Sequence, residues 1–284
     1  MTDTETPLLT SAVHDALLEA RVHDRTRVEC SLDLGRSRTT VGVGASGWTW
    51  GGRVFPFLEV CKDRTVYHWT SAGFEAVTRF TTSLIKLVPT EWGPPTFEID
   101  GIKMLPTAHI SPYADAERKV SLIEPRDKVI LDTCGGLGYF AAWCLRGGAR
   151  QVRSYEKNPD VIWLRSLNPW SPDSPWAGGP ASALTLATAD VAERIGSMAS
   201  ATFDAVLHDP PRFGIAGELY SQAFYGELAR VLRRGGRLFH YTGTPNKLTS
   251  GRNVPGEVAA RLRRAGFRTE FRGDGVLAVN AGRG

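Results

Sequence analysis

The sequence has few cysteines, no long apolar run and little net charge, and each of these absences excludes a class of protein. Its four cysteines are widely spaced, with no C-x-x-C pair and no cysteine–histidine cluster, so neither a zinc site nor a disulfide framework is expected. The N-terminus has no basic start followed by an apolar stretch, and nowhere do about 18 apolar residues follow one another, which argues against secretion and membrane spanning. We therefore expect a soluble, cytoplasmic protein that holds no metal.

The charge does not identify a partner. A formal net charge of +4 is too small to indicate nucleic-acid binding by itself. Arginine clusters such as 261–268 lie in stretches whose apolar spacing predicts amphipathic helices with a solvated basic face. Composition leaves open both the kind of partner and the oligomeric state.

The pattern of apolar, polar and turn residues changes along the chain and predicts three parts. Residues 1–24 hold an alanine- and leucine-rich helical pattern behind a threonine-rich tail. Residues 25–111 hold short alternating runs separated by Gly, Pro and Asp, a pattern typical of antiparallel strands and hairpins. In residues 112–284, apolar runs alternate with helical patterns, as in parallel βαβ units.

The third part predicts a sheet of seven strands, which we expect at KVILDT, QVRSYE, ALTLAT, FDAVLHD, GRLFHYT, FRTEFR and GVLAVN. Helical patterns separate the first six, and only Gly273-Asp274-Gly275, a hairpin turn, separates the last two. Five βα units closed by an antiparallel hairpin resemble the class I methyltransferase fold. The expected class is therefore α/β: a Rossmann-like seven-stranded methyltransferase sheet with a smaller β-rich N-terminal domain.

A glycine turn follows the first of these strands and opens a helix. Glycines let the backbone approach a ligand closely, and the new helix N-terminus points N–H groups at it. The turn resembles the methyltransferase motif D-x-G-x-G-x-G, with Asp132, Gly136 and Gly138 in place and Cys134 instead of the first glycine. The resemblance implies a site for S-adenosylmethionine, in which we expect Cys134 to be a small packing residue rather than a nucleophile.

Acidic residues follow the second and third strands. Glu156 ends the second strand, where a carboxylate can accept hydrogen bonds from both ribose hydroxyls of a nucleoside. Ala189 and Asp190 follow the third, at the position where methyltransferases contact adenine. Asp190 also fits the N-cap of the next helix, and the two roles are compatible.

The fourth strand ends in Asp209-Pro210-Pro211-Arg212-Phe213. An aspartate before two prolines makes a rigid turn whose carboxylate and backbone carbonyl can accept hydrogen bonds from an amino group. The turn resembles the D/N-P-P-Y/F/W motif of methyltransferases that act on exocyclic or amide nitrogens. This resemblance implies catalytic roles for Asp209, Pro210 and Phe213, although Arg212 occupies the usual aromatic position and Phe213 follows one place later.

The chain as a whole resembles a family of predicted methyltransferases known mainly from archaeal genomes, in its β-rich N-terminal part, the stretch 96–102 and the run HDPPRF. That resemblance implies only a methyltransferase whose acceptor is unassigned. Together with the Asp-Pro-Pro turn, it leads us to expect N-methylation of an amino group on an RNA base, a small molecule or a peptide. The N-terminal layout also resembles the spermidine synthases, so aminopropyl transfer from decarboxylated S-adenosylmethionine is the alternative. A non-catalytic RNA-binding scaffold is another. The Pro- and Trp-rich segment 168–180 could cap the cofactor cleft or pack on its rim.

Overall fold

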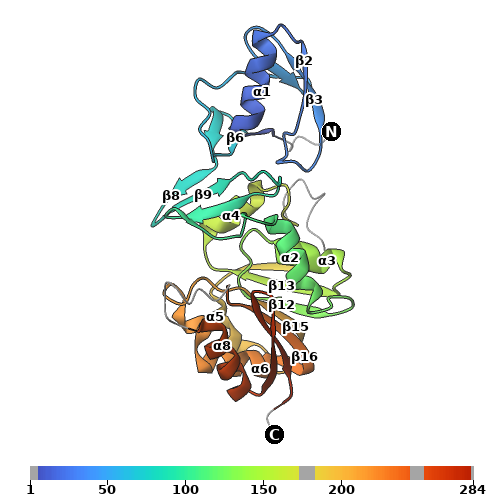
Figure 1. Ribbon diagram of the computed structural model, residues 1–284, viewed down its shortest axis with the longest axis vertical. Helices are drawn as coiled ribbons and strands as arrows, with labels where there is room; N and C mark the ends of the chain where they lie inside the picture. The colour runs from blue at the N-terminus through green and yellow to red at the C-terminus, as the bar shows by residue number, and fades with distance from the viewer. Residues whose placement is uncertain (1–5, 173–182, 244–252, 283–284) are drawn as a thin grey trace. The chain divides into compact units, whose positions relative to one another are not determined.

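The structure is a computed structural model that describes residues 6–172, 183–243 and 253–282 (Figure 1). The chain divides into two compact units, residues 1–115 with 163–179 and residues 116–162 with 180–284. The three parts expected from the sequence, residues 1–24, 25–111 and 112–284, stay a prediction about domains. None of the described helices is long and apolar enough to cross a membrane.

The first unit consists mostly of short antiparallel strands, as the alternating runs predict. They form three sheets, with strand orders β1-β6-β7, β2-β3-β4-β5 and β11-β10-β9-β8. The strands are β1 (Leu8–Leu9), β2 (Arg27–Cys30), β3 (Thr39–Val43), β4 (Trp48–Trp50), β5 (Arg53–Phe55), β6 (Tyr67–Thr70), β7 (Gly73–Ala76), β8 (Thr78–Phe80), β9 (Leu84–Val88), β10 (Thr96–Ile99) and β11 (Ile102–Lys103).

One helix, α1 (Ser11–Val22), completes the core of this unit. Its Leu17 is fully buried among residues of the first two sheets. Trp48 and Phe55 lie opposite each other on neighbouring strands, and their rings stack with centroids 4.6 Å apart. Burying two aromatic side chains in this geometry supplies packing energy that strands of three residues could not supply by backbone pairing alone.

The second unit is built on one seven-stranded sheet, which confirms the predicted fold class. The strand order is β14-β13-β12-β15-β16-β18-β17; the first five in this order are parallel, and β18 is antiparallel to both of its neighbours. The strands are β12 (Val129–Asp132), β13 (Gln151–Glu156), β14 (Leu184–Thr188), β15 (Phe203–His208), β16 (Leu232–Tyr241), β17 (Phe267–Arg272) and β18 (Gly275–Asn280). All seven lie at the predicted apolar runs.

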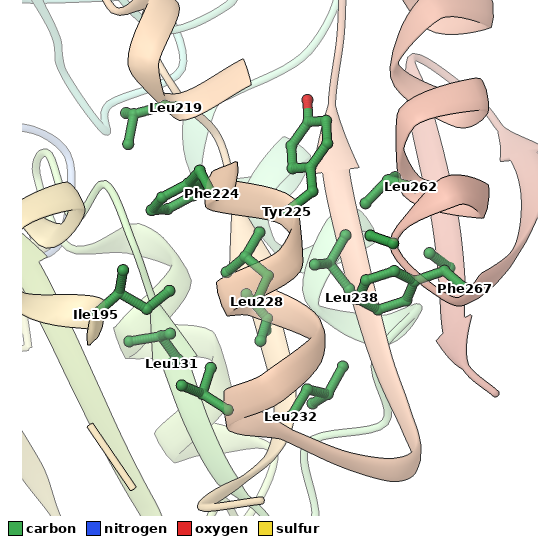
Figure 2. Packing of buried hydrophobic residues seen from close by; sticks show 14 of the residues in the cluster. Leu131, Ile195, Leu219, Phe224, Tyr225, Leu228, Leu232, Leu238, Leu262 and Phe267 are labelled. Atoms are coloured by element: carbon green, nitrogen blue, oxygen red, sulfur yellow. The ribbon is translucent and has the colours of Figure 1, made fainter. Parts of the chain in front are cut away.

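Apolar helix faces cover this sheet. The helices described from residue 112 onward are α2 (Pro112–Ser121), α3 (Tyr139–Arg146), α4 (Pro159–Leu167), α5 (Val191–Arg194), α6 (Gln222–Val231) and α8 (Val254–Arg264), with 3-10 turns η2 (Ile195–Ser197) and η3 (Gly217–Tyr220). Phe224 and Leu228 of α6 belong to one buried cluster with Leu131 and Leu238 of the sheet (Figure 2). These four residues are at most 5% exposed, so the helix is held by its apolar stripe.

The end of α6 differs from the sequence-based expectation. The helical pattern predicts a helix that continues through Arg234, but α6 ends at Val231, and Leu232 is extended at the start of β16. Leu232 is buried in the core cluster. Apolar spacing alone does not distinguish the last turn of a helix from the first residues of a buried strand.

Candidate active site

The predicted site residues of the second unit follow the carboxyl ends of adjacent parallel strands. Asp132 of β12 lies opposite Ser154 of β13 on one side and Leu207 of β15 on the other. The chain runs outward from β12 through β13 to β14 and then returns to β15 on the other side of β12. A crevice is expected where the strand order reverses in this way, at the end of β12.

The glycine turn after β12 is bent by left-handed residues. Gly136 has φ 49° and Gly138 has φ 79°, and Gly138 is the N-cap of α3. The Gly135 N–H donates to the carbonyl of Tyr155 (2.7 Å), and the Gly138 N–H donates to the carbonyl of Gly135 (2.8 Å). Only glycine takes such φ values without a steric cost, so this sequence fixes the turn close to the end of β13.

Glu156 joins the glycine turn to the start of α4. One carboxylate oxygen accepts from the Gly136 N–H (3.0 Å), and the other accepts from the Asn158 N–H (2.9 Å). A carboxylate offers about four lone-pair positions, more than these two backbone bonds use, and ribose hydroxyls are donors of the kind it accepts. The glutamate therefore both shapes the turn and can bind a ligand placed against it.

Asp132 and Cys134 lie inside the site. Asp132 is 1% exposed and accepts a hydrogen bond from the Ser154 hydroxyl (2.7 Å). Cys134 packs against the core cluster, and burial, helped by the negative charge of Glu156, raises the pKa of its thiol well above the usual value. A thiol that stays protonated is a poor nucleophile, which agrees with the expectation that Cys134 is a packing residue.

Ala189 and Asp190 follow β14. The Ala189 N–H donates to the carbonyl of Glu156 (3.1 Å), which places this loop beside the end of β13. Asp190 is the N-cap of α5 and accepts from the Ala192 N–H (2.8 Å). Its other oxygen lies 3.3 Å from Nζ of Lys157, whose pKa is raised by Asp190 and Glu218 despite partial burial. The N-cap role is observed, and an adenine contact stays a prediction.

The Asp209-Pro210-Pro211 turn follows β15 and lies beside a lysine that the sequence analysis did not identify. Nζ of Lys119, in α2, is 3.5 Å from Oδ2 of Asp209. The turn itself is tied to η3, because the Tyr220 hydroxyl donates to the carbonyl of Pro211 (3.0 Å). Phe213, 43% exposed, packs edge-on against the Tyr220 ring with centroids 5.5 Å apart. Its side chain is thus accessible for stacking on a planar ligand, the role that the sequence predicts for it.

Two buried histidines support the strand ends that carry Asp209 and Tyr241. His208 Nε2 donates to the carbonyl of Leu219 (3.1 Å), and Nδ1 accepts from the Thr133 hydroxyl (2.7 Å). His240 Nδ1 donates to the carbonyl of Tyr241 (2.8 Å), and Nε2 accepts from the hydroxyl of Tyr225, a residue shown in Figure 2. The two imidazole rings are 4.4 Å apart at their centroids. Each of the four ring nitrogens makes a hydrogen bond to another group of the protein, which fits a structural role for both histidines.

This pair predicts a loss of stability in mild acid. Burial lowers the pKa of His208 to about 4 and lowers that of His240 well below its usual value. Between these values and about 6.5, the unfolded chain binds more protons than the folded chain, so stability rises with pH in this window and is complete above it. For His208 alone, lowering the pH from about 6.5 to about 5.5 should cost about 1 kcal/mol of unfolding free energy, measured by urea denaturation.

The matched variant for this measurement is His208→Gln, which keeps a nitrogen within reach of the Leu219 carbonyl but does not titrate. Its unfolding free energy should be lower at pH 8 and should change less between pH 6.5 and 5.5 than that of the wild type. Equal pH dependence in the two proteins would show that His208 is not the group that titrates.

The structure thus brings together residues that the sequence predicts separately and adds others. Motif spacing identifies the carboxylates and glycines. It gives no sign of Lys119, Thr133 or His240, because their roles depend on burial and on neighbours far away in the sequence.

In the segment 168–180, Trp170 Nε1 donates to the carbonyl of Leu34 (3.0 Å) within the first unit, and residues 173–180 lie outside the described part of the chain. Among the described residues, no three His, Cys, Asp or Glu side chains gather in a way that could hold a metal.

Comparison with known sequences gives two informative relatives. The chain is 43% identical over 197 residues to an uncharacterized protein of Methanocaldococcus jannaschii, a match that spans 69% of this chain and 66%, just under two thirds, of that protein. It is 38% identical over 113 residues to polyamine aminopropyltransferase 2 of Streptomyces coelicolor, which spans 38% of this chain and 20% of the relative. No protein-family model matches the chain.

Comparison with solved structures agrees with the observed topology. A spermidine synthase in complex with the transition-state analogue AdoDATO superposes with a TM-score of 0.57 at 16% identity, over 72% of this chain and 73% of that one. The spermidine synthase of Thermotoga maritima gives a TM-score of 0.54, also at 16% identity, over 72% of each chain. An S-adenosylmethionine-dependent methyltransferase from Mesorhizobium loti gives 0.41 at 16% identity, over 58% of this chain and 94% of that one. At these identities the likeness concerns the fold alone, and the two spermidine synthases, together with the observed strand order, confirm the predicted α/β fold with a spermidine-synthase-like layout.

Proposed function

From the fold that this chain shares with spermidine synthases and class I methyltransferases, we propose that it is an S-adenosylmethionine-dependent methyltransferase that acts on a nitrogen atom. The observation that carries the proposal is the position of Asp209-Pro210-Pro211. The turn follows β15, the immediate neighbour of β12, and the glycine turn and Glu156 lie at the same edge of the sheet. Asp209, which would bind the amino nitrogen of the acceptor, thus lies at the same sheet edge as the glycine turn and Glu156, which would bind the methyl donor.

The residues at this edge fit S-adenosylmethionine. The Glu156 carboxylate, which lies at the glycine turn, can accept hydrogen bonds from the two ribose hydroxyls. Asp190 stands after β14, next to the loop residue Ala189, where its carboxylate could accept from the exocyclic amine of adenine. The N–H groups at the start of α3 suit the carboxylate of the amino-acid moiety. Asp132, the last residue of β12 before the glycine turn, is held in place by a hydrogen bond from the Ser154 hydroxyl.

When bound, S-adenosylmethionine supplies a methyl group activated by a positively charged sulfur. The protein then has chiefly to align the acceptor and exclude water. The Asp209 carboxylate accepts a hydrogen bond from the acceptor N–H and so directs the nitrogen lone pair toward the methyl carbon. With the donor bound, the N–C bond would form as the C–S bond breaks, and the methylated nitrogen would lose its proton to solvent as the product leaves. Phe213 can stack on the acceptor, and Pro210 keeps the turn rigid.

Aminopropyl transfer is the alternative, supported by the TM-score of 0.57 with a spermidine synthase and by the Streptomyces coelicolor relative. Two features of this sequence disfavour it. Its first loop lacks the glycine- and aspartate-rich pattern of spermidine synthases. The serines that follow their catalytic aspartate are replaced here by Pro210 and Pro211. Because the two reactions use donors that differ by one carboxylate, the donor preference distinguishes them.

Calorimetric titration with S-adenosylmethionine and, separately, with its decarboxylated form should show at least about tenfold tighter binding of the carboxylated donor, a difference of about 1.4 kcal/mol. Tighter binding of the decarboxylated donor would contradict methyl transfer and support aminopropyl transfer. Binding of neither would support a non-catalytic scaffold. With the donor established, methyl transfer from labelled S-adenosylmethionine to total RNA, to small amines and to peptides would identify the acceptor class. RNA as acceptor requires binding that weakens as salt is raised.

A further inference from the structure

A buried ammonium group lies against the proposed acceptor-binding carboxylate. Lys119 is 1% exposed, although it is a lysine on a helix whose other face is polar. Its Nζ lies 3.5 Å from Asp209 Oδ2 and 3.8 Å from the centroid of the Tyr241 ring. The Phe140 ring is also near, at 5.7 Å. Among its described contacts, the cation thus has a carboxylate and two aromatic rings as neighbours.

This environment differs from that of a surface ion pair. A lysine is rarely buried, because its charge is costly to remove from water unless a carboxylate and aromatic faces compensate. Exposed pairs contribute little and exchange partners readily. The Lys119 side chain is 2% exposed and that of Asp209 is 19% exposed, so the carboxylate is the member of the pair that solvent or a ligand can reach.

Three further titratable groups described around the Lys119–Asp209 pair add no positive charge. They are Tyr241 of β16, Tyr220 of η3 and Cys134 of the glycine turn. Burial and the negative charge of Asp209 raise the pKa of Tyr220, and burial and the negative charge of Glu156 raise that of Cys134, so both are neutral near pH 7. Lys119 therefore balances the charge that Asp209 brings to the acceptor side of the site.

We propose that Lys119 determines acceptor specificity by neutralising Asp209, so that the site rejects an acceptor that carries a positive charge. An aliphatic amine is an ammonium ion at pH 7, because its pKa is near that of a lysine, about 10.4. Beside a lone carboxylate such a cation would be attracted, but beside a carboxylate paired with a buried ammonium the attraction is cancelled. An uncharged nitrogen can still donate its hydrogen bond to Asp209. This inference rests on the proposed function, since it takes Asp209 as the group that meets the acceptor.

The test is calorimetric titration of the full chain with putrescine, a small diamine that is cationic at pH 7. The wild type should give no binding at millimolar putrescine. Lys119→Met removes the ammonium and retains most of the side-chain volume, and it should bind putrescine at least tenfold more tightly than the wild type. The double variant Lys119→Met with Asp209→Asn should lose that gain. Lys103→Met, the same change at an exposed lysine of the first unit, should behave as the wild type.

Putrescine binding by the wild type as tight as that of Lys119→Met would overturn the proposal, as would a gain that survives in the double variant. If Lys119→Met does not fold, the wild type decides: binding at millimolar putrescine contradicts charge rejection, and its absence supports it. Putrescine affinity is measured without a donor, so failure of this inference is distinguishable from failure of the proposed function, which the donor titration tests.

Discussion

Replacement of Asp209 by alanine should lower the rate of methyl transfer by about 10³-fold, the loss expected when a group that aligns and stabilises the reacting atoms is removed. The affinity for S-adenosylmethionine should change by less than about twofold, which is under 0.5 kcal/mol. The reason is positional: Asp209 follows β15 beside Lys119, while the turn that fits the donor follows β12. Single-turnover transfer and calorimetric donor binding measure the two effects separately.

Asp209→Asn is the matched variant for this test. Asparagine keeps an acceptor oxygen and the shape of the side chain, so it should retain more activity than alanine. It also limits the disturbance around Lys119, whose charge would otherwise be left buried beside an apolar methyl group. If either substitution weakened donor binding strongly while the protein remained folded, Asp209 would belong to the donor site, and its assignment to the acceptor would be wrong.

Glu156→Ala should have the reverse effect and weaken S-adenosylmethionine binding by roughly 1.5–3 kcal/mol, the range for hydrogen bonds that involve a charged group. The substitution removes the acceptor for the proposed ribose hydroxyls. It also leaves the N–H groups of Gly136 and Asn158 without their carboxylate, which loosens the turn that must meet the donor. Calorimetric titration measures the loss, and transfer at saturating donor should fall much less than in Asp209→Ala.

The control for Glu156 is Glu193→Ala, which removes an exposed carboxylate from α5 in the same unit. Its donor affinity should equal that of the wild type. Glu156→Gln, which keeps one acceptor oxygen, should fall between the alanine variant and the wild type. Donor affinity that is unchanged in Glu156→Ala would exclude the ribose role.

The fold of the second unit is predictable because its signals are local. Each parallel strand is a short apolar run, and each is followed by a helical pattern with its own turn residues. The hairpin at Gly273-Asp274-Gly275 needs only turn chemistry, and it joins β17 to β18 as expected. The prediction of the helix end fails where a helical pattern and a strand pattern overlap. Leu232 and Arg233 fit the last turn of a helix, but Leu232 is buried in the core and both residues belong to β16.

The candidate site is predictable only in part, for a related reason. Asp132, Glu156 and Asp209 each end a predicted strand, so the parallel sheet is enough to bring them to one edge. Lys119 stands in a helix with the composition of a surface element, and its position against Asp209 and Tyr241 depends on how α2 packs. The positions of His208 and His240 could not be predicted for the same reason, because their hydrogen-bond partners Thr133 and Tyr225 lie in other parts of the sequence that no motif links to them.

The path of the chain between the two compact units limits how the molecule can be divided. Residues 163–179 belong to the first unit, although the segments on either side of them belong to the second. Trp170 is one residue of this segment that contacts the rest of the first unit: its ring packs against Tyr113 (ring centroids 5.1 Å apart), and its Nε1 donates to the carbonyl of Leu34. A fragment that stops at residue 115 lacks this tryptophan. No single cut separates the two units, so neither can be lost or exchanged as one uninterrupted stretch of gene.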